Sequence, residues 1–444
     1  ARASGEARKG RVDDDRADAD HRVESAMTAA AGPVPSRRPF AWWREAGPDA
    51  RRALAAAMFG WMLDAFDVML FALVLPYVRA DLSLTSAQGG YLGSVMLVAA
   101  AGGGVGFGWF ADRFGRTRAL MFSVTLYSFF TFACGFAHSL EQFVVFRIFL
   151  GLGMGGVWSS GAALVSESWP AEHRGKALGI MQSGWAIGYA AAVLVSGVVQ
   201  PRYGWRAVFF IGILPALFTL WVQRRVEEPA IWTASSRSGI PAPGLPSIFK
   251  SGIGGLTIVL TLMNTCTLFA WWGFNLWLPS YLKSSAAQGG AGLSGAATTT
   301  YLFIMQAGMW VGYVSFGFIS DRFGRKRSYV TYLLAAALLL AVYVSVRNPA
   351  ALLVLGPLVA FAATGYFSGF GAVTAEVYPT PVRATAQGFT YNIGRLASAA
   401  APYLVGTLAD THGFGAALLV CSAAFVAAAI LWIWIPETKG RALT

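Results

Sequence analysis

The chain has 444 residues, of which 56% are hydrophobic and 13% are charged, and its formal net charge is +12. Soluble domains carry about 25% charged residues, so this composition excludes a set of water-soluble domains and indicates the lipid bilayer as the solvent. The basic residues lie in short clusters between long apolar runs. This pattern is typical of membrane-protein loops and argues against nucleic-acid binding.

The N-terminal segment comes first along the chain. Residues 1–25 are polar and rich in charge, without an apolar core, which excludes a signal peptide. We expect residues 1–52 to form a disordered cytoplasmic tail. Because the first methionine is Met27, the sequence also fits a translation start there, with the preceding residues upstream of it. Neither interpretation gives this segment a function.

Twelve apolar runs follow, and a helix needs about 20 such residues to cross a membrane. Six runs precede a polar stretch that contains Pro and Ser, and six follow it. We therefore predict an all-α membrane protein with transmembrane helices near residues 53–78, 88–111, 118–138, 141–166, 175–199, 205–224, 253–282, 298–320, 328–346, 350–376, 384–409 and 414–435.

The predicted domains follow from these runs. Residues 53–225 form an N-terminal six-helix bundle, 226–252 a central cytoplasmic loop, 253–436 a C-terminal six-helix bundle and 437–444 a cytoplasmic tail. Basic residues gather before the first run, after runs 2, 4 and 8, and at the chain end, which an even number of spans places on one side. The positive-inside rule makes that side the cytoplasm. We expect both termini to be cytoplasmic and the protein to lie in a bacterial-type inner membrane.

Two motifs occur twice with one common spacing. The segment GWFADRFGRTR at Gly108–Arg118 is matched 209 positions later by GFISDRFGRKR at Gly317–Arg327. The Glu-x6-Arg element at 167–174 is matched 209 positions later at 376–383. Because two unrelated motifs share this spacing, we infer two pseudo-symmetric six-helix halves in parallel orientation. Transporters built in this way bind substrate between the halves and rock them against each other.

The motifs resemble those of a known family. The G-x-x-x-D-R-x-G-R element after runs 2 and 8 is similar to the signature loop of the major facilitator superfamily. The doubled Glu-x6-Arg, Arg147–Gly153 and Pro436–Gly440 resemble its sugar-porter-like and metabolite/proton symporter branches. Leu63–Asp67 and Tyr391–Arg395 are similar to elements of aromatic-acid and sialate- or lactate-type proton symporters. The resemblance covers residues 53–441 and implies the twelve-helix major facilitator fold.

The sequence departs from those relatives at two points. Ala65 replaces the usual Gly of the element in run 1, and Val157 stands where the resemblance leads us to expect a Glu. A coupling role at position 157 is therefore not implied here. Run 5 has Gly184 and Gly188 without the Gly-Pro element of drug/proton antiporters, which disfavours an antiporter.

Asp64 and Asp67 are the candidates for proton coupling. Their spacing puts both on one face of the first helix, and an intramembrane carboxylate is a functional hypothesis by default. Such a group can take up and release a proton as the cavity opens to each side. Arg147 in run 4 is the candidate partner. The alternative is a permanent Asp–Arg pair that only fixes helix packing.

Arg395 is the candidate substrate anchor. An Arg in the middle of a span needs an anion, and a guanidinium matches a carboxylate with two hydrogen bonds. We expect it to bind the carboxylate of an organic acid; the alternative is a pair with Asp64 or Asp67. Further candidate contacts, for which packing or interhelical hydrogen bonds are the alternative, are Tyr391, Asn392, Trp272, Asn275, Gln182 and Gln306.

The duplicated charges at the cytoplasmic ends are candidates for a gate. In the resembled family such charges form salt bridges that hold the inner gate shut, whereas topology alone would also explain basic residues there. The candidates are Asp112, Arg113, Arg116, Glu167, Arg174, Asp321, Arg322, Arg325, Glu376 and Arg383.

These features predict a secondary active transporter that couples protons to uptake of a small organic acid by alternating access. An aromatic acid, a lactate-like monocarboxylate and sialic acid are the candidate substrates. A sugar or polyol/proton symporter is the alternative, because that branch shares the Glu-x6-Arg and Pro-Glu-Thr-Lys-Gly elements. A non-transporting nutrient sensor of the same fold is a further alternative.

We expect neither an enzyme nor a cofactor or metal site. No nucleophile–base constellation or phosphate-binding loop occurs, and the three cysteines stand apart within apolar runs. With no nucleotide-binding domain, energy must come from an ion or substrate gradient. The expected partners are a small carboxylate substrate, a proton and the bilayer, and we expect a monomer.

Overall fold

Helices account for most of the chain that the computed structural model describes, namely residues 43, 46–169, 174–228, 245–249, 252–378 and 380–439, and no strand occurs among them. Pro48–Thr444 forms one unit and Ala1–Gly47 another, of which residues 43, 46 and 47 are described. Most of the predicted N-terminal tail, with the start proposed at Met27, lies outside the described residues.

The first half contains the helices α3 to α8. Gly204, at a φ of 79°, interrupts the helical backbone inside α7, three residues after Pro201. The boundary predicted between runs 5 and 6, at residues 200–204, therefore coincides with this break inside α7, and run 6 is completed by α8. The helices are α3 (Pro48–Asp81), α4 (Ser86–Phe114), α5 (Arg116–Cys134), α6 (Leu140–Ser168), α7 (Arg174–Ile211) and α8 (Leu214–Arg225).

The second half contains the helices α10 to α17. Runs 10 and 11 are each built from consecutive pieces, α13–η3–α14 and α15–α16. The elements are η1 (Leu245–Phe249), α10 (Gly254–Lys283), η2 (Ala286–Gln288), α11 (Gly295–Phe323), α12 (Arg325–Ser345), α13 (Pro349–Gly365), η3 (Tyr366–Gly369), α14 (Phe370–Val377), α15 (Thr380–Ser398), α16 (Ala400–His412) and α17 (Phe414–Leu431).

Within the described ranges, nine helical segments are long and apolar enough to cross a membrane by length and composition. The number is below twelve partly because Lys176–Thr219 counts once, although it holds most of runs 5 and 6. The remaining runs are α5, which is rich in Ser and Thr, and run 11, which is divided between α15 and the 13-residue α16. The twelve predicted runs thus all have helical counterparts.

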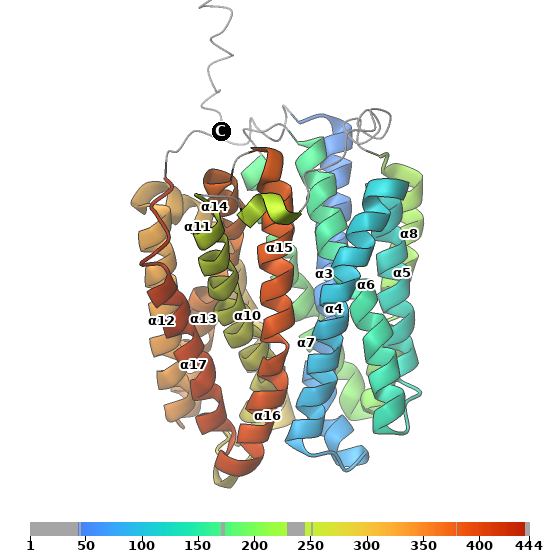
Figure 1. Cartoon of the computed structure of the whole chain (residues 1–444). Coiled ribbons are helices and arrows are strands. Elements are labelled where there is room, and N and C mark those ends of the chain that lie inside the picture. The colour runs from blue at the N-terminus through green and yellow to red at the C-terminus, as the bar shows by residue number, and fades with distance from the viewer. Residues whose placement is uncertain are drawn as a thin grey trace, which may run out of the picture. The chain divides into compact units, whose positions relative to one another are not determined.

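The two halves lie side by side, with α3 to α8 in one and α10 to α17 in the other (Figure 1). They meet where α3 contacts α10, α4 contacts α15 and α16, and α7 contacts α11. We call the end where α5 and α12 begin the basic end, because it carries the duplicated Arg residues. The other end, where α4 begins and α16 ends, is called the opposite end.

Candidate substrate and proton site

A cavity lies between the halves, bounded by residues from the inner turns of their helices. Both halves contribute to it, which is the arrangement expected where substrate binds between rocking bundles. Its lining residues are Trp61, Gln182 and Trp185 from the first half, and Leu268, Trp271, Trp272, Tyr313, Phe367, Tyr391 and Arg395 from the second.

Four tryptophans form much of the cavity wall. The ring centroid of Trp185 lies 4.7 Å from that of Trp61 and 5.4 Å from that of Trp271. Trp271 in turn lies 4.8 Å from Trp272 in an edge-to-face arrangement. Contacts at these distances and tilts are favourable between aromatic rings. The wall is therefore apolar and aromatic, and it is continuous from one half to the other.

Arg395 is the cationic group of the cavity and is only 2% exposed. One of its Nη atoms donates to the Tyr391 hydroxyl at 3.3 Å, and its Nε has no acceptor. Its guanidinium carbon lies 4.9 Å from the Tyr391 ring centroid. In the described part of the chain, no carboxylate lies within 4.0 Å of it. The guanidinium is therefore available to an anion.

Asp64 and Asp67 are fully buried in α3. None of their four carboxylate oxygens accepts a hydrogen bond. The Thr131 hydroxyl, which lies near Asp67, donates instead to the Tyr127 carbonyl at 2.9 Å. Asp64 is under the electrostatic influence of Arg395, and Asp67 under that of Asp64. Because an unpaired buried charge costs several kcal/mol, binding a proton is the direct way to relieve either site.

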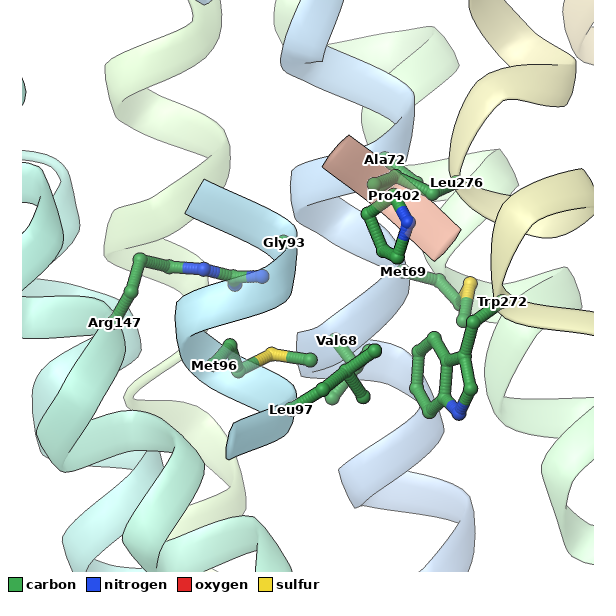
Figure 2. A pocket seen from close by; sticks show the side chains of 10 residues that line it. All are labelled: Val68, Met69, Ala72, Gly93, Met96, Leu97, Arg147, Trp272, Leu276 and Pro402. Carbon is green, nitrogen blue, oxygen red and sulfur yellow. The ribbon is translucent and has the colours of Figure 1, made fainter. Parts of the chain in front are cut away.

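Arg147 does not form the predicted ion pair with Asp67. Its Nε donates to the Leu92 carbonyl of α4 at 3.4 Å, and its guanidinium carbon lies 4.0 Å from the Phe71 ring centroid. Figure 2 shows the side chain reaching from α6 towards the α4 turn at Gly93. The expectation of a direct pair was wrong because a backbone carbonyl and an aromatic face surround the cation.

Arg147 also lines a second, smaller cavity between the first one and the opposite end. Trp272 lines both cavities. The other residues around it are apolar, as Figure 2 shows: Val68, Met69, Ala72, Gly93, Met96, Leu97, Leu276 and Pro402. Apart from Arg147, this space offers no charged group to a ligand.

The predicted substrate contacts divide into two groups. Four line the cavity: Gln182, Trp272, Tyr391 and Arg395. The amide nitrogens of the other three donate to carbonyls four residues earlier in their own helices, at 2.9–3.0 Å, and those residues do not line it: Asn275, Gln306 and Asn392. A substrate role for these three remains a prediction.

Sequence reasoning missed several lining residues. Trp61 precedes Asp64 by three positions and Trp185 follows Gln182 by three, so each shares a helical face with a residue that was singled out. That spacing could have identified both. The other omissions are apolar or aromatic residues, namely Leu268, Trp271, Tyr313 and Phe367.

Comparison with known proteins identifies the family. The model described as Major Facilitator Superfamily matches residues 57–315 and 285–444. The chain belongs to the major facilitator superfamily. It is accordingly a multi-pass membrane transporter and not an enzyme.

Curated transporters match this chain over nearly their whole length. The probable 4-methylmuconolactone transporter of Cupriavidus pinatubonensis is 33% identical over 410 residues, covering 91% of this chain and 94% of the relative. The cis,cis-muconate transport protein of Acinetobacter baylyi is 31% identical, with 87% and 94% covered. The sialic acid transporter NanX of Escherichia coli is 31% identical, with 88% and 96% covered.

A solved structure shares the fold. The xylose transporter XylE from E. coli, in a partially occluded inward-open conformation, superposes with a TM-score of 0.73 and covers 89% of this chain and 100% of its own. Its sequence identity is 18%, so this likeness concerns the fold alone.

At the basic end, the ion pairs seen among the described residues join helices of the same half. Arg116 lies 2.9 Å from Glu167, linking α5 to α6. Arg325 lies 3.0 Å from Glu376, linking α12 to α14, and also pairs with Asp321. These two arrangements are pseudo-symmetric copies and tie each half together internally.

Two other predicted gate residues contact aromatic rings. Arg113 stacks on Trp109 of its own helix at 5.7 Å, and Arg322 on Phe323 at 5.5 Å. Three other side chains lie outside the described residues: Asp112, Arg174 and Arg383. A gating role for the whole set remains a prediction.

A further duplicated charge appears in the structure. Glu228 accepts from the Thr117 backbone N–H at 3.1 Å, and Glu437, 209 positions later, accepts from those of Arg325 and Lys326 at 2.8 and 3.2 Å. The first N–H groups of a helix lack partners within it, and a carboxylate there is favourable. Burial raises the pKa of Glu437, but four backbone hydrogen bonds outweigh this and hold it below its ordinary value.

At the opposite end, polar contacts cross between the halves. The Asp410 carboxylate in α16 accepts from the first two backbone N–H groups of α4, at 3.0 and 2.9 Å, and lies 4.0 Å from Arg79 of α3. The backbones are close here, since a Cβ on Gly90 would lie 2.2 Å from the Pro402 carbonyl oxygen. The halves are thus joined tightly at this end.

Nearer the basic end, an aromatic stack joins the halves. Trp158 of α6 lies parallel to Tyr391 of α15, with centroids 4.4 Å apart and planes 14° apart. Tyr391 lines the cavity and accepts a hydrogen bond from Arg395. The stack therefore connects the cationic group of the cavity to the contact between the halves.

Proposed function

We propose that this transporter carries small organic acids together with protons across the inner membrane by alternating access. The observation that carries the proposal is Arg395, a buried guanidinium in an aromatic cavity between the halves, with no carboxylate at ion-pair distance among the described residues. A substrate carboxylate supplies the missing anion with matching geometry.

The relatives support an acid rather than a sugar as substrate. Those reported above are named as transporters of 4-methylmuconolactone, cis,cis-muconate and sialic acid. The sugar alternative rests on shared motifs and on a likeness of fold at 18% identity. A neutral sugar would leave the Arg395 charge unpaired in a low-dielectric site, which is unfavourable.

Asp64 and Asp67 provide the proton sites of the proposed mechanism. Arg395 is the cation that acts on Asp64. When a substrate carboxylate neutralises Arg395, Asp64 loses the influence of that cation and its protonated form gains in stability. Substrate and proton binding are therefore thermodynamically linked, and each favours the other. This linkage gives symport rather than exchange.

The proposed orientation places the basic end in the cytoplasm, with both termini on that side. The contacts of Asp410 then close the extracellular side, and the Trp158–Tyr391 stack lies on the path to the cytoplasm. The duplicated ion pairs keep each half rigid while the halves rock, and they serve the inner gate.

Binding to the purified protein tests the substrate class. Intrinsic tryptophan fluorescence, to which the cavity tryptophans contribute, is followed on titration with benzoate, cis,cis-muconate, N-acetylneuraminate and xylose. We expect at least one acid to bind, and Arg395→Lys to weaken it about tenfold or more because the two-point contact is lost. Binding of xylose without binding of any acid would contradict the proposal.

A further inference from the structure

Three buried indole N–H groups at the cavity have no acceptor. They belong to Trp61, Trp185 and Trp271, whose side chains are 3–5% exposed. Arg395 Nε in the same lining is also without an acceptor, whereas Gln182 Oε1 is the only unpaired buried acceptor among the described lining residues. Hydrogen-bond donors thus outnumber acceptors around this space.

Most other buried tryptophans in the described ranges do find acceptors. The indole nitrogen of Trp169 donates to a carbonyl at 2.7 Å, that of Trp277 at 2.8 Å, and that of Trp205 to Asp81 at 3.3 Å. Outside the cavity, Trp432 is the one buried indole without an acceptor in this part of the chain. An unpaired buried donor costs about 1–3 kcal/mol, so three at one cavity indicate a ligand that pairs with them.

The arrangement separates two kinds of donor. Arg395 is suited to a carboxylate, and Tyr391 occupies only one of its five N–H groups. The three indoles are neutral, lie in ring contact with one another, and span both halves. A carboxylate on Arg395 would leave their N–H groups unpaired unless the same molecule carries another acceptor.

We propose that the substrate is a planar acid with a second hydrogen-bond acceptor, a carbonyl, carboxylate or phenolic oxygen, which accepts from the indole N–H groups of Trp61, Trp185 and Trp271. This inference rests on the proposed function and narrows it to bifunctional acids. The three tryptophans are then specificity-determining residues, since they favour acids that carry the second acceptor over acids of the same shape that lack it.

The test uses pairs of ligands that differ only in the acceptor. 4-Acetylbenzoate carries a carbonyl where 4-isopropenylbenzoate carries a methylene group of similar shape, and the 3-substituted isomers cover a second geometry. Dissociation constants are measured by isothermal titration calorimetry for the full chain. We expect the acetyl compound of at least one pair to bind about tenfold more tightly, the effect of one satisfied buried donor.

Trp→Phe variants then assign the preference. Trp61→Phe, Trp185→Phe and Trp271→Phe each keep an aromatic face and remove one N–H group. In at least one of them the tenfold preference should fall to about threefold or less, with the affinity for the isopropenyl compound nearly unchanged. The matched control is Trp432→Phe, which removes an equally buried, unpaired N–H outside the cavity and should leave the preference intact.

The outcomes are distinct. Equal binding of both members of each pair to the unsubstituted protein would overturn the inference, and so would a preference that persists in all three variants. Either result leaves the proposed function standing, because acids still bind. Binding of no acid at all would overturn the proposed function as well. If a variant fails to fold, the binding preference of the unsubstituted protein for the acetyl compounds still tests the inference.

Discussion

The four charged residues inside the spans share one property. Each is at most 2% exposed, and none takes part in an ion pair within 4.0 Å in the described part of the chain: Asp64, Asp67, Arg147 and Arg395. A packing role would favour permanent pairs, because unpaired buried charges destabilise a fold. Groups that exchange a proton or a substrate must instead be free to change partners. The absence of ion pairs at these four residues therefore supports a role in transport chemistry.

Asp67→Asn should abolish proton-driven accumulation of substrate, because an amide cannot carry the proton. Counterflow of labelled substrate, which needs no net proton movement, should persist. Both are measured in proteoliposomes. Asp49→Asn, at an exposed carboxylate near the start of α3, is the control and should retain both activities. Accumulation by Asp67→Asn at the unsubstituted level would rule out this role.

Tyr391→Phe should weaken substrate binding less than Arg395→Lys does. The phenylalanine keeps the ring that stacks on Trp158 but removes the hydroxyl that accepts from Arg395. We expect KM to rise about threefold to tenfold with kcat little changed, as for loss of one positioning hydrogen bond. Initial uptake rates over a range of substrate concentrations give both constants. An unchanged KM would mean that the hydroxyl does not orient the guanidinium.

At the scale of elements, the starts of α5 and α12 are stabilised in the same way in both halves. α5 and α12 each follow a glycine with a positive φ, Gly115 at 116° and Gly324 at 100°. Each is capped by a carboxylate from beyond the last helix of its own half, Glu228 or Glu437. Within the Pro-Glu-Thr-Lys-Gly element, Glu437 therefore has a structural function in this chain: it holds the segment after α17 to the start of α12.

Glu437→Gln should lower the melting temperature by about 1–2 °C at pH 7, the scale of one exposed helix cap in a large domain. The pKa of Glu437 lies below its ordinary value of 4.5, so its stabilising charge is fully present above that value. It is lost as the pH falls through the lowered pKa. The difference between the two proteins should therefore shrink below pH 4.5, as measured by thermal unfolding in detergent. A difference that grows on acidification would contradict this account.

The elements were predictable from the sequence to different degrees. The apolar runs and the 209-residue spacing predicted the long helices and the two halves, because both depend on composition and local order, but they did not predict the short helices η1 and η2. The Glu228–Glu437 pair follows the same spacing and could have been found. The partner of Arg147 could not, because it is a main-chain carbonyl, and carbonyls leave no mark in a sequence. The tryptophan wall of the cavity could not be predicted either, because it depends on how the two halves pack against each other.

At the scale of the whole molecule, the charged contacts differ between the two ends. Those described at the basic end join helices within one half, whereas Asp410 at the opposite end joins α16 to α3 and α4. The halves are thus rigid units held together at the opposite end, with the cavity between them. This arrangement corresponds to a transporter closed on its proposed extracellular side.

Asp410→Asn should loosen that closure. An amide keeps the shape but loses the negative charge that favours the α4 N-terminus and Arg79. Spin labels on the ends of α4 and α16 should show a longer distance or a new longer population by double electron–electron resonance. Asp81→Asn is the matched control, since Asp81 pairs with Arg206 of its own half at 2.7 Å. Equal effects of the two variants on the measured distance would contradict a role of Asp410 in closing the opposite end.

In the proposed function, a proton gradient drives an organic acid through this protein. Uptake of labelled acid into proteoliposomes, with the outside acidic and the inside neutral, tests it most directly, with xylose as the sugar comparison. We predict transient accumulation of the acid above its external concentration, abolished by a protonophore and by Arg395→Lys. Accumulation of xylose in place of any acid, or acid uptake that ignores the proton gradient, would contradict the claim.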